Sequence, residues 1–339
     1  MVARWAGLPV LAAVMLLATA CVNPSAGQSQ QPGTSASTST GAQKRIAFFG
    51  FAKANSFASA TFAGIEDYAK AHGATAEFFD PNFDAQAQVR QIQDAVTAKR
   101  FDVFVVQAND GAAVAPALRS AVQAGIAVVI HFTPAGTRYD TAQPQVDGTV
   151  TLVDVPTQNG ETLGRLAVQA CQSRKLNPCE VGYLEGLKAL PLDNARTNAA
   201  VGALKQAPGV KLVAQLEGGY TQDTGRKAMQ DILQRDPGID VVIGSSQAVA
   251  GAEAVAKGKH IMYVANGGSR QTVEAVQAGR WFAAYYLPVR TLGAKAAELG
   301  LDKAQGKQVP AANIMTDVQP GKSLGTKEVL AGVTGEYDE

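Results

Sequence analysis

The 339-residue sequence contains few of the residues that catalysis and metal binding most often use. It has 3 cysteines and 3 histidines, and its formal net charge is +1. His72, His131 and His260 have no cysteine or aspartate partner at the spacing of a metal site or a catalytic triad, so we expect them to be structural. A near-neutral charge without a basic patch excludes a nucleic-acid partner. No apolar run after residue 43 is long enough to cross a membrane.

The motifs of common enzyme classes are also missing. Gly244-Ser-Ser-Gln-Ala248 approaches the nucleophile elbow of hydrolases but lacks the closing glycine. No glycine-rich dinucleotide fingerprint follows the first predicted strand, and Gly321-Lys322-Ser323 lacks the first glycine of a phosphate loop. Asp80, Asp84 and Asp110 are carboxylates of the kind that glycoside hydrolysis needs, but they fit turns and helix caps better. We therefore expect no catalytic residue, no cofactor and no metal.

The first 21 residues have the pattern of an export signal. Arg4 provides a basic start, Leu8 to Ala18 an apolar core, and Thr19-Ala20 the small residues that a signal peptidase requires. Cys21 then resembles the lipobox cysteine of bacterial lipoproteins, which receives a diacylglyceryl chain, although Ala18 stands where leucine is usual. We predict a lipoprotein signal peptide at 1–21 and lipidation of Cys21. The alternative is an ordinary secretory signal with an incidental cysteine.

The next segment, 22–43, has no charged and no aromatic residue. Such a segment cannot bury enough apolar surface to offset its ordering entropy, so we predict a flexible linker. The protein is then expected outside the cytoplasm, held by its lipid at the outer face of the cell membrane. In that compartment we expect Cys171 and Cys179 to form a disulfide, the alternative being two buried free thiols.

From Arg45 onward, short apolar runs rich in β-branched residues alternate with amphipathic helices. The predicted strands are 45–50, 75–79, 102–107, 126–132, 149–153, 181–184, 210–216, 241–244, 260–265 and 281–285. The predicted helices are 59–72, 85–99, 113–124, 160–174, 194–206, 223–234, 248–257, 270–278 and 287–306. This alternation predicts parallel sheets that helices cover on both faces.

The pattern of strands and helices restarts half-way along the chain. Two similar halves predict an α/β protein with two doubly wound, Rossmann-like domains and a cleft between them. The helix at 287–306 comes after the second unit is complete, so we expect it to return to the first and to create a multi-crossover hinge. The predicted N-terminal domain is 44–153 plus 287–311, and the predicted C-terminal domain is 154–286 plus 312–335.

Ligands of open parallel sheets bind beyond the carboxyl ends of the strands. The loops predicted there carry amides, hydroxyls and aromatic rings, with few ionisable groups. These side chains suit a neutral polyhydroxylated ligand, because they hydrogen-bond its hydroxyls and pack on its C–H faces. The candidate ligand-binding residues in these loops are Asn55, Phe57, Phe132, Thr133, Tyr220, Ser245, Ser246, Asn266 and Tyr286.

The chain resembles the ribose-type periplasmic sugar-binding proteins over about Lys44 to Ile314. The resemblance rests on the order of the elements and on Ala54-Asn-Ser-Phe57, Ala195-Arg196-Thr-Asn, Asn266-Gly267 and Tyr285-Tyr-Leu-Pro288. It implies a type I periplasmic-binding-protein fold that captures a sugar or polyol by hinge closure. It further implies that Arg196, at the start of a predicted helix, is a further ligand-binding residue. It also implies delivery to the permease of an ABC importer by a monomeric receptor.

Two departures from the family change the expected ligand. Sugar binders of this type commonly carry an Asp-Arg pair where this chain has Phe132-Thr133, and an Asp where it has Asn266. The pocket is then expected to keep Arg196 as its main charge, which predicts a smaller or less polar ligand, such as a short polyol, a furanose or a deoxy sugar. A ligand with a carboxylate is the alternative to a neutral one. The alternative to import is a sensor that presents its closed form to a membrane receptor or kinase.

Overall fold

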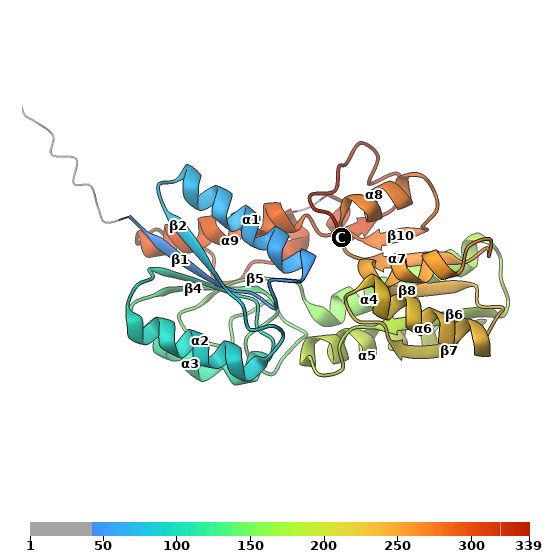
Figure 1. The fold of residues 1–339 in the computed structure, drawn as a ribbon, viewed down its shortest axis with the longest axis horizontal. Coiled ribbons are helices and arrows are strands. Elements are labelled where there is room, and N and C mark those ends of the chain that lie inside the picture. Colours follow the sequence, from blue (N-terminus) through green and yellow to red (C-terminus); the bar gives the residue numbers. More distant parts are fainter. Residues whose placement is uncertain (1–42, 319) are drawn as a thin grey trace, which may run out of the picture. The chain divides into compact units, whose positions relative to one another are not determined.

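The computed structural model describes residues 43–318 and 320–339, whose course Figure 1 shows. The predicted signal peptide, Cys21 and nearly all of the predicted linker lie outside the described residues. Within the described ranges no helix combines the length and the apolar character needed to span a membrane.

Two sheets form the framework of the described chain. The first is parallel throughout, in the order β2 (Thr75–Phe79), β1 (Arg45–Phe49), β3 (Val103–Val106), β4 (Ala127–Phe132) and β5 (Val150–Val153). The second has the order β11 (Leu324–Gly325), β10 (Ala283–Tyr285), β9 (Met262–Asn266), β8 (Val241–Ser245), β6 (Cys179–Glu185) and β7 (Val210–Glu217). It is parallel except that β11 runs antiparallel to β10. The predicted fold of two parallel-sheet α/β domains is confirmed.

Helices cover both faces of each sheet. The bounds are α1 (Ser56–Ala71), α2 (Ala85–Ala98), α3 (Gly111–Gln123), α4 (Pro156–Ser173), α5 (Pro191–Lys205), α6 (Gln222–Arg235), α7 (Ser246–Val255), α8 (Arg270–Gln277) and α9 (Val289–Ala304). In β1, Ile46 and Phe48 join one apolar cluster, while Ala47 and Phe49 join the cluster on the opposite face. Because strand side chains alternate between faces, a strand that is buried on both sides is apolar at every position.

Helix α9 lies beside α1 on the first sheet, although it follows the last parallel strand of the second sheet (Figure 1). The two helices approach closely at glycines: a Cβ at Gly64 would lie 1.9 Å from the carbonyl oxygen of Arg290, and one at Gly293 would lie 2.1 Å from that of Thr61. After α9 the chain pairs with β5, where the amide of Val153 donates to the carbonyl of Asn313 at 3.1 Å. The chain therefore passes between the two sheets after β5, before α9 and after this pairing. The domain boundaries given above stay a prediction.

Several helices begin two to four residues before the predicted start. Helices α1 and α3 do so because a capping residue precedes them, whereas α4 and α5 begin at Pro156 and Pro191 without a side-chain cap. Asn55 caps α1 by accepting from Ala58 N–H at 3.0 Å, and Asp110 caps α3 in the same way. The structure also contains the Cys171–Cys179 disulfide, which joins the last turn of α4 to the first residue of β6.

Candidate ligand-binding site

A cavity lies at the carboxyl ends of the strands, between residues of the two sheets. Its space, including the mouth, is about 490 Å³. It is lined by Phe51, Asn55, Phe57, Phe83, Phe132, Leu190, Leu192, Arg196, Tyr220, Ser246, Gln247, Asn266, Leu287 and Tyr337. Aromatic and aliphatic walls with a few polar groups are typical of small-molecule sites.

The first domain supplies a wall of aromatic rings. Phe132 ends β4 with a φ of +64°, a left-handed conformation that costs a bulky residue about 1–2 kcal/mol and often marks a functional site. Its ring lies 4.8 Å from that of Phe57 and 5.9 Å from that of Phe51, measured between centroids. Phe83 stacks on Tyr220 of the second domain with 6.5 Å between centroids. Flat apolar faces therefore stand on both sides of the cavity.

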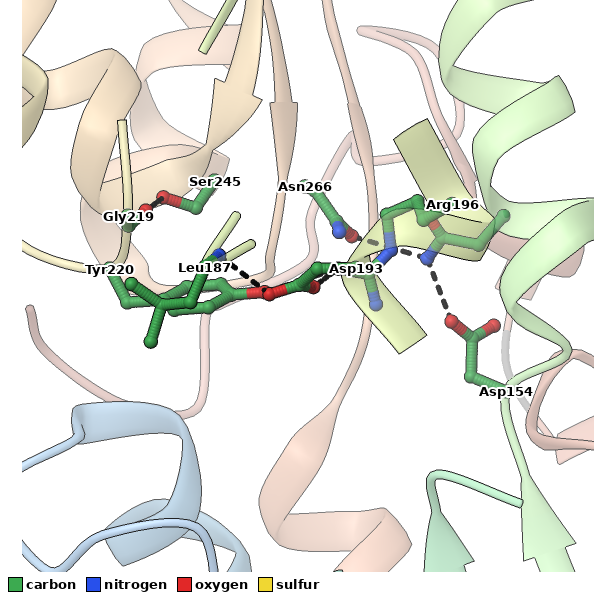
Figure 2. A network of polar contacts seen from close by, with 9 residues as sticks. Asp154, Leu187, Asp193, Arg196, Gly219, Tyr220, Ser245 and Asn266 are labelled. Carbon is green, nitrogen blue, oxygen red and sulfur yellow. Dashed lines mark hydrogen bonds and ion pairs between the residues drawn. The ribbon is translucent and has the colours of Figure 1, made fainter. Parts of the chain in front are cut away.

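The second domain supplies a buried ion pair, shown in Figure 2. Asp193 in the first turn of α5 accepts from Nη1 of Arg196 at 2.9 Å and from the hydroxyl of Tyr220 at 2.5 Å. Its other oxygen accepts from the amide of Leu187 at 2.8 Å. Only 4% of Arg196 is exposed, and its guanidinium carbon lies 5.8 Å above the ring of Phe132. The cation is thus held between a carboxylate and an aromatic face.

Two nitrogens of Arg196, Nε and Nη2, are buried without a hydrogen-bond partner among the described residues. Burial alone would lower the pKa of Arg196, but the negative groups around it, Asp193 and Asp154 among them, raise it. The guanidinium is therefore charged. A buried donor that lacks a partner costs free energy, so these N–H groups are suited to bind an oxygen of a ligand in the cavity.

A second set of buried hydrogen bonds holds the side chain of Asn266. Asn159 donates through Nδ2 to Asp154 at 2.7 Å and to Oδ1 of Asn266 at 3.3 Å. Asp154 also accepts from the hydroxyl of Tyr285 at 2.5 Å, and burial raises the pKa of its carboxyl group. Figure 2 shows Asp154 and Asn266 at the two ends of this set of hydrogen bonds. The amide of Asn266 is thereby oriented at the edge of the cavity.

The structure brings most of the predicted residues together. Lining the cavity are Asn55, Phe57, Phe132, Arg196, Tyr220, Ser246 and Asn266. Arg196, which was expected to be the main charge of the pocket, is paired with Asp193. Within the described part of the chain, no three His, Cys, Asp or Glu side chains are placed to hold a metal ion.

Three predicted residues do not line the cavity. Ser245 caps α7, accepting from Ala248 N–H at 3.1 Å and donating to the carbonyl of Gly219 at 2.6 Å, so its hydroxyl is used. Thr133 is buried next to Phe132 in the chain, and its hydroxyl has no hydrogen-bond partner among the described residues. Tyr286 is buried in the apolar cluster of the second domain that contains Tyr263 and Trp281, and burial raises its pKa to about 12. Because neighbours in an extended chain face opposite ways, Leu287 takes the position at the cavity that was expected for Tyr286.

The candidate set left out half of the lining residues. They are Phe51, Phe83, Leu190, Leu192, Gln247, Leu287 and Tyr337. It also left out Asp193, although the spacing of Asp193 and Arg196, three residues apart on a helix, is a signal for an ion pair. Tyr337 carries no such signal, because it lies in an irregular segment without periodicity.

Residues 46–308 match the model of the periplasmic binding protein domain. This is more than half of the chain. The chain belongs to the periplasmic binding protein family. The family confirms the resemblance found in the sequence and places the protein outside the cytoplasm. A periplasmic binding protein binds its ligand without converting it, so this chain is a binding protein and not an enzyme.

Individual relatives of this periplasmic binding protein have low sequence identity to it. The D-allose-binding periplasmic protein of Escherichia coli K12 is 29% identical over 140 residues, which cover 39% of this chain and 44% of that relative. A solute-binding protein of Actinobacillus succinogenes with bound D-allose superposes with a TM-score of 0.71 at 19% identity, over 86% of this chain and 100% of that one. A Mycobacterium smegmatis protein in complex with β-D-fucofuranose gives a TM-score of 0.68 at 21% identity, over 80% of this chain and 88% of that one. These two structures show the shared fold.

Proposed function

We propose that this periplasmic binding protein captures a small neutral sugar or polyol and delivers it to an ABC importer. The observation that carries the proposal is the buried guanidinium of Arg196 at a cavity with six aromatic rings. Its Nε and Nη2 have no hydrogen-bond partner in the described part of the chain. Hydroxyl oxygens satisfy such donors, and sugar C–H faces pack on such rings. The relatives named above, with D-allose and fucofuranose as ligands, support the same class.

The charge of the site favours a neutral ligand over one with a carboxylate. Asp193 neutralises Arg196 at 2.9 Å, and Asp154 lies close enough to raise the pKa of the same guanidinium. A carboxylate on the ligand would meet these two buried acids as well as the arginine. Like charges in a buried site repel strongly because the local dielectric constant is low. The apolar wall of Phe51, Phe57 and Phe132 further supports a ligand with a less polar face, such as a furanose or a deoxy sugar.

We propose capture by hinge closure between the two domains. Contacts across the cavity already join them: Gln247 on α7 donates to the hydroxyl of Ser56 on α1 at 3.1 Å, and Tyr220 stacks on Phe83. The three passages of the chain between the sheets form the hinge. The domain boundaries are those predicted from the sequence, at 153/154, 286/287 and 311/312. Closure buries the ligand between both domains, and the closed form is the one that the importer recognises.

We further propose that the protein works as a monomer held to the membrane by a lipid on Cys21. The export pattern of residues 1–21 and the uncharged segment after it support this part of the proposal. Lipid labelling of the wild type and of Cys21→Ser tests it, and equal labelling of both would contradict it. A sensor that reports to a membrane receptor uses the same closure. A permease and an ATPase encoded beside the gene support import, whereas a neighbouring sensor kinase would contradict it.

Titration calorimetry with D-allose, D-fucose, glycerol and myo-inositol tests the binding function. We expect saturable binding of at least one of them and a loss of about a hundredfold in affinity in Arg196→Ala, because a hydrogen bond to a charged donor is lost. Arg165→Ala is the control, since this arginine lies on the outer surface of α4. Full affinity in Arg196→Ala would contradict the proposed site, and no binding of the panel by the wild type would contradict the ligand class.

A further inference from the structure

The segment 335–338, called the strap below, lies beside the cavity and contacts both domains. On the second domain, the amide of Arg270 at the start of α8 donates to the carbonyl of Tyr337 at 2.8 Å. The guanidinium of Arg270 donates through Nε to Asp338 at 2.7 Å and forms an ion pair with it through Nη2. A Cβ at Gly335 would lie 2.4 Å from the backbone nitrogen of Arg270, so the strap sits directly against the main chain there.

On the first domain, the strap supplies a cap for α9. Glu336 accepts through Oε2 from the amides of Arg290 at 2.9 Å and Thr291 at 3.0 Å, and through Oε1 from the hydroxyl of Thr291. Helix α9 starts after Pro288 without a side-chain cap of its own. A carboxylate at a helix N-terminus satisfies orphan amides and interacts well with the helix dipole. Since α9 packs on the first sheet, the strap is tied to both domains within four residues.

Tyr337 lies between these two anchors and reaches the cavity. It is 6% exposed and lines the cavity together with Leu287, Ser246 and Asn266. Its hydroxyl lies 3.4 Å from the position that a Cβ of Gly267 would take, beside the loop after β9. The backbone on each side of it is held, so the ring is a fixed part of the wall.

Tyr337 also differs from the other lining residues in its place in the chain. The match to the family model ends at residue 308, and every other residue that lines the cavity lies inside the matched range. Tyr337 is therefore the lining residue that the family model does not include. Specificity is a difference of affinities, so a bulky ring in the wall favours ligands that pack beside it over ligands that clash with it.

We propose that Tyr337 is a specificity-determining ligand contact, positioned by the anchors Glu336 and Asp338 on the two sides of the hinge. The inference rests on the proposed sugar or polyol binding at this cavity. The ring packs on an apolar face of the ligand and limits the room beside Leu287. Ligands of different size and polarity therefore depend on Tyr337 to different degrees.

The first test compares one exchange at two buried tyrosines. Tyr337→Leu and Tyr263→Leu are titrated with D-allose, D-fucose, glycerol and myo-inositol beside the wild type; Tyr263 is 4% exposed and lies in the outer core of the second domain. We expect Tyr337→Leu to weaken the best ligand about tenfold and to change the order of affinities, since a stacked aromatic contact is lost. Tyr263→Leu is expected to keep the order. An unchanged order in Tyr337→Leu would overturn the inference while leaving the proposed function intact, and a wild type that binds none of the four would overturn both.

The second test begins with a measurement that needs no ligand. Hydrogen exchange at the amides of Arg290 and Thr291 is measured in the wild type, in Glu336→Ala and in Glu328→Ala, whose side chain is exposed in the same region. We expect exchange about tenfold faster in Glu336→Ala only, because these amides lose their acceptor. We also expect Glu336→Ala to shift the order of affinities in the same direction as Tyr337→Leu. Unchanged exchange, or an unchanged order of affinities, would show that the strap does not position Tyr337.

Discussion

Arg196 is the central residue of the site, and the contacts of its guanidinium explain how a charge is stabilised in an apolar cavity. Asp193 and Tyr220 hold one side of the guanidinium, and Phe132 lies across its face. The nitrogens Nε and Nη2 have no partner among the described residues and remain for a ligand. Taking an ion pair out of water is costly, and removing one partner leaves an uncompensated buried charge. The pair is therefore best tested by replacing the acid.

We predict that Asp193→Asn lowers the free energy of unfolding by about 3 kcal/mol, because Arg196 stays buried without its carboxylate. The control is Asp223→Asn on α6, which breaks an exposed pair with Arg226 at the same spacing of three residues. Such surface pairs contribute between about 0 and 1 kcal/mol. Urea denaturation measures both variants, and equal effects of the two would contradict this account of the buried pair.

The buried imidazole of His131 gives a prediction about pH. Burial lowers its pKa from 6.5 to about 3, so the folded protein keeps it neutral where the unfolded chain would protonate it. The neutral imidazole of His131 makes its full contribution to the free energy of unfolding above pH 6.5, and this contribution is lost as the pH falls toward 3. The stability difference between the wild type and His131→Gln is expected to change by about 1.4 kcal/mol per pH unit in this window. Denaturation from pH 7 to 4 measures it, with His260→Gln at the exposed histidine as control, and a flat difference for His131→Gln would contradict the prediction.

At the scale of helices and strands, glycines set how closely the elements that carry the site approach. Gly160 on α4 faces α5, where a Cβ would lie 2.1 Å from the carbonyl oxygen of Arg196 itself. Gly202 on α5 faces open space, with no atom within 4 Å of a Cβ. The crossing of α4 and α5 thus positions the guanidinium through backbone contact.

We predict that Gly160→Ala displaces α5 and lowers ligand affinity at least about tenfold, together with stability. Gly202→Ala keeps the affinity and raises stability by up to about 1 kcal/mol, because alanine favours a helix more than glycine does. Calorimetry and thermal denaturation of both variants provide the comparison. Unchanged affinity in Gly160→Ala would show that the helix crossing does not position Arg196.

Most elements could be predicted from the sequence, because buried parallel strands and amphipathic helices leave strong periodic patterns. The positions that failed depend on three-dimensional geometry. The sequence does not reveal which face Tyr286 and Leu287 take after the three-residue strand β10. It also does not reveal that a segment beyond residue 332 folds back to place Tyr337 in the cavity. Ser245 carries two valid signals, for a strand end and for a helix cap, and the cap uses its hydroxyl.

At the scale of the whole molecule, contacts across the cavity stabilise the closed form of the two domains relative to the open form. The hydrogen bond from Gln247 to Ser56 and the stacking of Phe83 on Tyr220 are lost when the domains separate. We predict that ligand lowers the radius of gyration in small-angle scattering, and that Gln247→Ala weakens affinity several-fold by favouring the open form. Gln234→Ala on the exposed face of α6 is the control. An identical radius of gyration with and without ligand would contradict hinge closure.

The most direct measurement of the central claim is a crystal structure of the protein with the best ligand of the calorimetric panel. The account predicts a neutral sugar or polyol with an oxygen about 2.7–3.2 Å from Nε or Nη2 of Arg196 and a C–H face against Phe132. A ligand bound elsewhere, or one in the cavity that leaves both of these nitrogens without a partner, would contradict it.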